Sequence, residues 1–258
     1  MKRLVPLLLL LTACIGSTGS DLVTFPAFAA GPADANGQPL TFSNGLHWNI
    51  TLTKATLHIG AVYLNRSVPV SGGQERECFL PGVYVAEVLE GVDVDVLSSK
   101  PQAFPTRGNG TEDRAVTGEV WLAGQRIDAL DDRTQIAEVA GSATRDGVSM
   151  RFEGTITIGR NRVAASTDPA RPGAKPLCAE RIVTPIPVSV TPHDTGSLLV
   201  RVDPRGWFAN VELGELEPVS PESDLRRFTD DNESQPSLNL YRGLRSASSG
   251  VYTFEWMP

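Results

Sequence analysis

The stretch VSMRFEGTITI, residues 148–158, alternates apolar and polar side chains with a period of two. This period is typical of a β-strand that places one face on a core and the other in water. Asp146-Gly147 comes directly before it and is a turn signal for a β-hairpin, so we expect residues 135–144 to form the partner strand. The apolar face is predicted to hold Val148, Met150, Phe152, Ile156 and Ile158, interrupted only by Gly154.

The same period occurs from residue 46 onward, with a change of phase. The apolar side chains occupy even-numbered positions over 46–53 and odd-numbered positions over 57–63. A strand that keeps one face on a core cannot change phase without an extra residue. We therefore expect a bulge or a turn near Lys54 and Ala55, with Ala61 and Tyr63 on the inner face.

Other stretches continue the β pattern. Residues 83–89 and 92–97 are predicted to form a hairpin joined at Glu90-Gly91. Residues 98–114 are rich in Pro, Gly and Asn, which favours a long surface loop. Further strands are expected at 119–123, 182–190, 198–202, 207–213 and 251–256.

Two proline signals refine this picture. Pro185 and Pro187 remove two backbone donors from their strand, which places it at a sheet edge. Ser234 before Pro236 is typical of a helix start and predicts one short helix over 236–244. About ten strands and one helix predict an all-β fold, either an antiparallel β-sandwich or two packed β-sheets, with at most one short helix near the C-terminus.

The beginning of the chain has the pattern of an export signal. Lys2 and Arg3 precede an apolar run over 4–11, which is shorter than the roughly 20 residues that span a bilayer. The tetrad Leu11-Thr12-Ala13-Cys14 resembles the lipobox of bacterial lipoproteins. The resemblance implies that residues 1–13 are removed and that Cys14 is acylated, with palmitate among its lipids. It also implies a cell-envelope protein held on the membrane through that lipid, and Ile15 in place of Asp favours the outer membrane.

The composition suggests how the rest of the chain is organised. Residues 14–45 are expected to form the lipidated N-terminus, a flexible spacer and an extended lead-in, with an edge strand near 22–28 broken by Pro26. Residues 46–258 are expected to form a β-rich globular domain. This is one unit or two subdomains divided at the Pro-rich connector 166–176.

Cysteine usage predicts one disulfide. Of three cysteines, acylation of Cys14 leaves Cys78 and Cys178, and an even pair in an exported protein most simply forms a bridge. In the chain-entropy model, closing a loop of about 100 residues stabilises a fold by about 4 to 5 kcal/mol. Two buried thiols are the alternative.

The charge of the chain argues against nucleic acid as a partner. Without Lys2 and Arg3, 21 basic residues face 30 acidic ones, which is a formal charge of −9. The basic residues form no stripe along the sequence. An acidic surface of this kind repels a polyanion.

Asp194-Thr195-Gly196-Ser197 resembles the active-site loop of aspartic peptidases. That chemistry needs two carboxylates that share a proton, and the chain has one such string. Pro192 and His193 also precede it where the family has an apolar strand. We expect a tight turn between two strands here, and no catalytic residue.

A copper or zinc site is the remaining chemical candidate. His47, His58 and His193 are the only histidines, and imidazole suits both metals. Their positions on the strand pattern do not bring them together, and there is no His-x-His or Cys-x-x-Cys string. We therefore expect no cofactor and a non-catalytic envelope protein that binds an unknown envelope protein or surface ligand, or maintains surface structure. A copper- or zinc-binding envelope lipoprotein is the alternative.

Overall fold

The computed structural model describes residues 20–68, 82–124, 127, 129, 132–159, 180–231, 233–248 and 250–258. The strands are β1 Leu22–Phe25, β2 Ala27–Ala30, β3 Leu40–Ser43, β4 Asn49–Ile59, β5 Ala61–Asn65, β6 Tyr84–Val88, β7 Val92–Asp95, β8 Gln102–Ala103, β9 Gly108–Thr111, β10 Ala115–Trp121, β11 Gln135–Arg145, β12 Val148–Thr157, β13 Ile182–Val190, β14 Ser197–Val202, β15 Leu225–Phe228 and β16 Tyr252–Met257. The helices are the 3-10 turns η2 Pro204–Phe208 and η3 Leu213–Glu215, and α2 Gln235–Leu244. The all-β prediction, with one short helix near the C-terminus, is confirmed.

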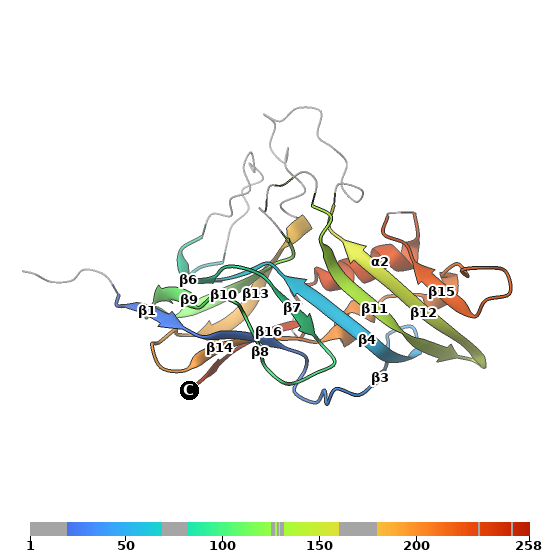
Figure 1. Ribbon diagram of the computed structural model, residues 1–258, viewed down its shortest axis with the longest axis horizontal. Coiled ribbons are helices and arrows are strands. Elements are labelled where there is room, and N and C mark those ends of the chain that lie inside the picture. Colours follow the sequence, from blue (N-terminus) through green and yellow to red (C-terminus); the bar gives the residue numbers. More distant parts are fainter. Residues whose placement is uncertain are drawn as a thin grey trace, which may run out of the picture.

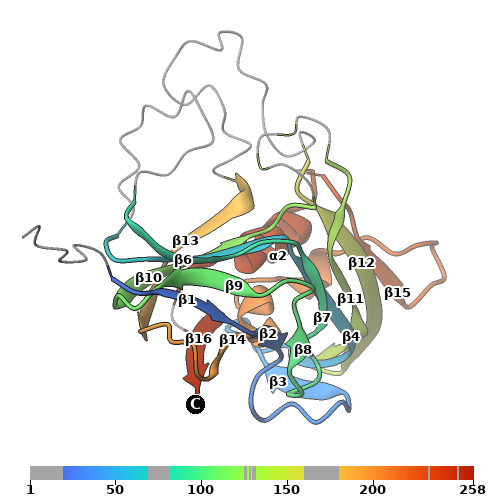
Figure 2. The same ribbon diagram turned by 60° about the vertical axis from the view of Figure 1, so that its left-hand side comes forward.

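The strands form three sheets. The first sheet has the order β1-β9-β6-β5-β10-β13, the second β15-β12-β11-β4-β3 with β7 also on β4, and the third β16-β14-β2-β8. The first sheet lies on the left of Figure 1, the second on the right, and the third below the first. Figure 2 shows α2, which packs on η2 and η3. Buried side chains from all three sheets form one hydrophobic core.

The hairpin predicted from residues 135–158 is present. β11 and β12 pair from Gln135–Thr157 to Arg145–Val148, and Asp146 and Gly147 form the turn with positive φ angles of 52° and 81°. Val148 is exposed, so the buried face of β12 begins at Met150. The turn chemistry and the period of two therefore predicted this element correctly.

The phase change in β4 is a β-bulge, as predicted. Ala140 of β11 pairs with Lys54, whereas Gly141 pairs with Leu52, so Thr53 is the extra residue. The chain then leaves the second sheet at Gly60 and continues as β5 of the first sheet. The inner face of β5 is formed by Val62 and Leu64, and the expectation that Tyr63 lies on it is wrong.

The predicted second hairpin is wrong. β6 pairs with β5 and β9 of the first sheet, whereas β7 pairs with β4 of the second. Glu90, with a φ of 65°, and Gly91 turn the chain from one sheet into the other. The expected loop over 98–114 contains the short strands β8 and β9.

The expected strand at 207–213 is also wrong. Asp203 accepts a hydrogen bond from the backbone N–H of Arg205, and Pro204 starts the 3-10 turn η2. This turn buries both Trp207 and Phe208, which adjacent strand positions would point to opposite faces. β15 was not predicted.

The sheets contain both parallel and antiparallel ladders, and they join strands that are distant in the sequence. Two ladders are parallel, β2 with β14 and β12 with β15. β1, β2 and β3, from the expected lead-in, all belong to sheets. β13 and β14, which follow the connector 166–176, pair with β10 and β2, which precede it.

Two proline-based predictions are confirmed. β13 forms an edge of the first sheet. Ser234 caps α2 through its hydroxyl, which accepts from the N–H of Ser237. Among the described residues, no helix is long and apolar enough to cross a membrane.

Candidate functional site

The lipidation and disulfide predictions concern residues that the structure does not describe. Cys14, Cys78 and Cys178 all lie outside the described ranges. Both predictions stand as they were made from the sequence.

The three histidines have different surroundings. His47 is exposed in the turn before β4, with a φ of 64°. His58 Nδ1 lies 2.7 Å from Asp93 Oδ1, and His193 Nδ1 lies 3.2 Å from Glu112 Oε1. Within the described ranges, no group of three or more His, Cys, Asp or Glu side chains is placed to hold a metal ion.

The peptidase-like string forms a turn between β13 and β14. Gly196 has a φ of 90°, and Asp194 Oδ1 accepts a hydrogen bond from the backbone N–H of Thr24 at 3.0 Å. This carboxylate satisfies a donor on the edge strand β1. Residues 194–197 therefore form the tight turn between two strands that was predicted from the sequence.

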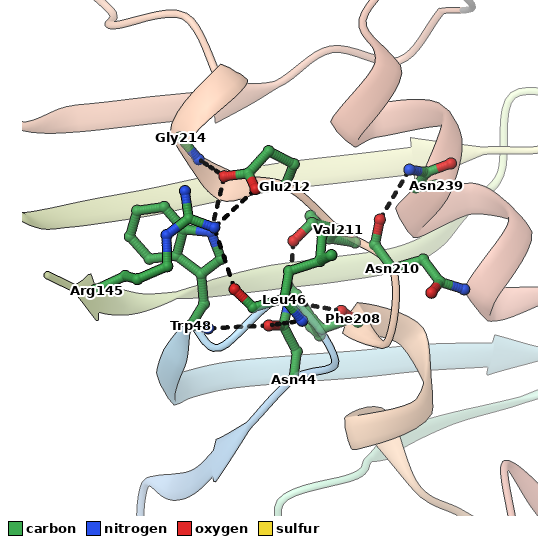
Figure 3. A network of polar contacts seen from close by, with 10 residues as sticks. All are labelled: Asn44, Leu46, Trp48, Arg145, Phe208, Asn210, Val211, Glu212, Gly214 and Asn239. Carbon is green, nitrogen blue, oxygen red and sulfur yellow. Dashed lines mark hydrogen bonds and ion pairs between the residues drawn. The ribbon is translucent and has the colours of Figure 1, made fainter.

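One cluster of polar contacts involves Glu212 (Figure 3). Its Oε1 accepts from Trp48 Nε1 at 2.8 Å and from Gly214 N at 3.0 Å, and its Oε2 pairs with Arg145 Nη1 at 2.8 Å. The guanidinium of Arg145 also lies 4.2 Å from the centroid of the Trp48 ring. The hydrogen bond from Arg145 is the main cause of the lowered pKa of Glu212.

Asn44 extends this cluster on its buried side (Figure 3). Its amide donates to the carbonyls of Phe208 and Val211 and accepts from the N–H groups of Leu46 and Trp48. The network thus ties the turn before β4 to the η2–η3 segment. Because the Glu212 charge is paired with Arg145, we interpret the network as structural.

A different arrangement lies on the outer face of the first sheet. Glu87, Tyr63 and Glu119 form one row across β6, β5 and β10, since Tyr63 pairs with both carboxylate residues. A register shift in β6 pairs Tyr84 with Asn65, which places Tyr84 on the same face as Glu87. We call this surface the acidic–aromatic face; it comprises Tyr63, Asn65, Tyr84, Glu87, Glu119 and Trp121.

Glu119 is the central group of the acidic–aromatic face. Its side chain is fully buried, and its carboxylate accepts from Asn65 Nδ2 at 2.8 Å and from Trp121 Nε1 at 3.1 Å. Both donors are neutral. Desolvation by burial exceeds their effect, so the pKa of Glu119 is raised.

Asn65 leaves an acceptor unused beside this carboxylate. Its side chain is fully buried, and its Oδ1 has no hydrogen-bond partner among the described residues. A buried acceptor without a donor costs about 1 to 3 kcal/mol. The site therefore holds more acceptors than donors.

Three aromatic rings surround these groups. The Tyr63 ring lies 4.5 Å from Trp121 and 5.1 Å from Tyr84, centroid to centroid. Burial and the nearby carboxylates of Glu87 and Glu119 raise the pKa of Tyr63, and burial followed by Glu119 raises the pKa of Tyr84 to about 12. The face thus combines two carboxyl groups with three aromatic rings, of which Tyr84 is exposed and Tyr63 and Trp121 are half-buried.

A shallow groove of about 370 Å³ lies at the end of this face nearest the sheet edge. Its lining includes Tyr84 and Glu87 at one side and residues of β1 and β9 at the other. Tyr84 is 39% exposed, so the groove gives solvent access to this end of the face.

The sequence contains a weak signal for this site, which the alternation of apolar and polar residues does not show. Tyr63-x-Asn65 and Glu119-x-Trp121 each place a polar and an aromatic residue two positions apart, hence on one side of a strand. Alternation assigns Glu119 to the solvent side. Its burial arises from tertiary structure, which no local pattern reports.

Comparisons with known proteins leave the function open. No protein-family model matches the chain, and no curated protein matches it. Among solved structures, the fold is similar to MbnP from Methylosinus trichosporium, with a TM-score of 0.40 and 11% identity over 92% of this chain and 99% of that one. A similarity this weak carries no conclusion about function. The fold and the site define an all-β protein with a buried carboxyl among aromatic rings on one face of a sheet, and no cation pairs with that carboxyl in the described part of the chain.

Proposed function

We propose that this chain is a lipid-anchored protein of the bacterial cell envelope that binds a partner, without catalysis, through the acidic–aromatic face. The anchor rests on the lipobox at residues 11–14, and Ile15 favours the outer membrane. The observation that supports the binding face is Glu119. It is a buried carboxyl with a raised pKa and no cationic partner among the described residues. Buried groups with perturbed pKa values often mark functional sites.

The surroundings of Glu119 favour binding over catalysis. General acid–base chemistry needs a route for the proton, through groups that gain and lose it near neutral pH. The two partners of Glu119 are the amide of Asn65 and the indole of Trp121, and neither titrates in that range. The carboxyl is therefore better suited to recognise a group than to exchange a proton with it.

The anchor is tested by fractionating bacteria that express the full chain or Cys14→Ser. We expect the parent protein in the membrane fraction with its N-terminus at an acylated Cys14, and the variant unprocessed or released. Identical processing and membrane association of the two proteins would remove the lipoprotein part of the proposal.

The binding face is tested in the same cells by photo-crosslinking. A photoreactive amino acid is placed at Tyr84, and a matched control at Val148, which is 54% exposed on β12 of the second sheet. A discrete product that forms at Tyr84 and disappears on Glu119→Gln supports the face as the contact surface. Equal products from both positions would contradict it.

A further inference from the structure

We propose that the acidic–aromatic face binds a primary ammonium group. Glu119 is its counter-ion, Asn65 Oδ1 its second acceptor, and the rings of Tyr63 and Trp121 lie beside it. This inference rests on the proposed binding face and names the chemistry of the partner.

The acceptor atoms of the site outnumber its donors, so a ligand that binds here would have to supply hydrogen-bond donors. Each oxygen of Glu119 accepts from a neutral donor and retains accepting capacity, since a carboxylate offers about four lone-pair positions. Asn65 Oδ1 accepts nothing. A ligand that supplies several N–H groups would satisfy these acceptors together.

The charge of the site favours a cation as this donor. Glu87 and Glu119 flank Tyr63 on neighbouring strands, and in the described part of the chain no ion pair joins either carboxylate to Arg, Lys or His. Aromatic faces add attraction for a cation through their quadrupoles. Tyr63 is the residue opposite Glu119 on β5, and its ring lies 4.5 Å from that of Trp121.

The geometry favours a primary ammonium over other organic cations. A quaternary ammonium has no N–H for Asn65 Oδ1. A guanidinium is planar and binds a carboxylate best through both oxygens at once, whereas the Glu119 carboxylate is fully buried and one lone pair of each oxygen is already used by Asn65 and Trp121. A compact ammonium can use one remaining lone pair and turn another N–H toward Asn65.

The ammonium can belong to a free amine or to a lysine side chain. Because Glu119 is fully buried, the group must enter on a slender alkyl chain. The groove beside Tyr84 and Glu87 would hold the rest of the ligand.

The test is a titration of the full chain in detergent micelles, followed by the NMR signal of the Trp121 indole N–H, which Trp121→Phe assigns. The probes are 1,4-diaminobutane and a short peptide with one lysine, with tetramethylammonium and butylguanidinium as matched controls. We expect saturable shifts with the two amine probes and at least about tenfold weaker binding of both controls. Saturation by the diamine alone assigns a free amine as the source, and saturation by the peptide assigns a protein lysine.

Variants tie the binding to the proposed atoms. Glu119→Gln should weaken amine binding at least about tenfold, whereas Glu222→Gln, an exposed acid in the turn before β15, should leave it within about twofold. Near-ultraviolet circular dichroism checks the fold of each variant. If Glu119→Gln does not fold, Asn65→Ala replaces it and should weaken binding in the same direction.

Three results would overturn the ammonium proposal. They are no shift with either amine up to about 10 mM, equal binding of tetramethylammonium, or a pKa of Glu119 in the free protein at or below its ordinary value, which would mean that the chain supplies its own cation. If any of these occurs while crosslinking at Tyr84 still captures a partner, the binding face stands and the ammonium assignment fails.

Discussion

Trp121 donates its indole N–H to the carboxylate of Glu119, two residues earlier on the same strand, at 3.1 Å. The protein has a second pair of this kind, in which Trp48 donates to Glu212 at 2.8 Å. Arg145 accompanies the second pair and lowers the pKa of Glu212, whereas burial raises the pKa of Glu119, which has no cation beside it in the described ranges. The presence or absence of one guanidinium thus separates a structural contact from a candidate site.

The raised pKa of Glu119 predicts how the stability of the fold varies with pH. A carboxyl whose pKa is higher in the folded state than its ordinary 4.5 supports folding at low pH, and this support is lost as pH rises through the folded-state value. We expect Glu119→Gln to be more stable than the parent at about pH 8, by roughly 1 kcal/mol, and no more stable at about pH 4. Urea unfolding at the two pH values measures this difference.

The same comparison for Glu212 should have the opposite sign, because the pKa of Glu212 is lowered. Its contribution is present above the ordinary pKa and is lost as pH falls through the folded-state value. If the unfolding free energy of Glu119→Gln varied with pH in the same way as that of the parent, the pKa of Glu119 would not be raised in the folded state.

Arg145 should matter more than other arginines of the same hairpin. Arg145→Ala leaves Glu212 without its counter-ion and removes the contact with the Trp48 ring, so we expect a loss of about 1 to 3 kcal/mol in unfolding free energy. Arg151→Ala is the matched control, because its pair with Asp224 is more than half exposed on both sides. That variant should lose less than about 1 kcal/mol. Similar losses in both variants would contradict a special role for the Glu212 network.

Gly60 and Gly147 should tolerate alanine differently. A Cβ at Gly60 would lie 1.8 Å from the carbonyl oxygen of Ala123, so Gly60→Ala requires the backbone to move where the chain changes sheets. We expect a loss of more than about 3 kcal/mol or a failure to fold. Gly147 has open space around it and a φ of 81°, so Gly147→Ala should cost about 1 kcal/mol. Thermal unfolding of the two variants, compared with the parent, decides between these costs.

The two cysteines that remain after acylation should be oxidised. We expect a free-thiol assay on denatured, unreduced mature protein to read near zero, because Cys78 and Cys178 form an even pair in an oxidising compartment. Reduction before the assay should expose both thiols. Two reactive thiols without reduction would contradict the bridge.

Local signals predicted those parts of the fold that are local. Asp146-Gly147 and the alternation after it specify a hairpin without help from the rest of the chain, and Ser234-Gln235-Pro236 specifies a helix start in the same way. Glu90-Gly91 also marks a change of direction. Nothing in that dipeptide states that β6 and β7 join different sheets, so the hairpin predicted there is wrong.

The candidate site could not be predicted for the same reason, because the sequence does not state which sheet each strand joins. The chain passes from the second sheet to the first at Gly60, and this inverts which side of β5 faces the core. Tyr63 was therefore expected inside, although it lies on the outer face. A period of two reports which residues share a side, but tertiary packing decides which side becomes buried, as Glu119 shows.

The third sheet has a consequence for the order in which the protein folds. β2 comes near the beginning of the chain, and its parallel partner β14 follows about 170 residues later. The hairpin β11–β12 can close as soon as its own residues are available, but β2 must remain unpaired on that side until residues near the end of the chain reach it. Contacts of such sequence separation form late, because loop closure must come first. During this interval β2 exposes an apolar strand edge, and this is the period in which the nascent chain is most vulnerable to pairing with the wrong partner.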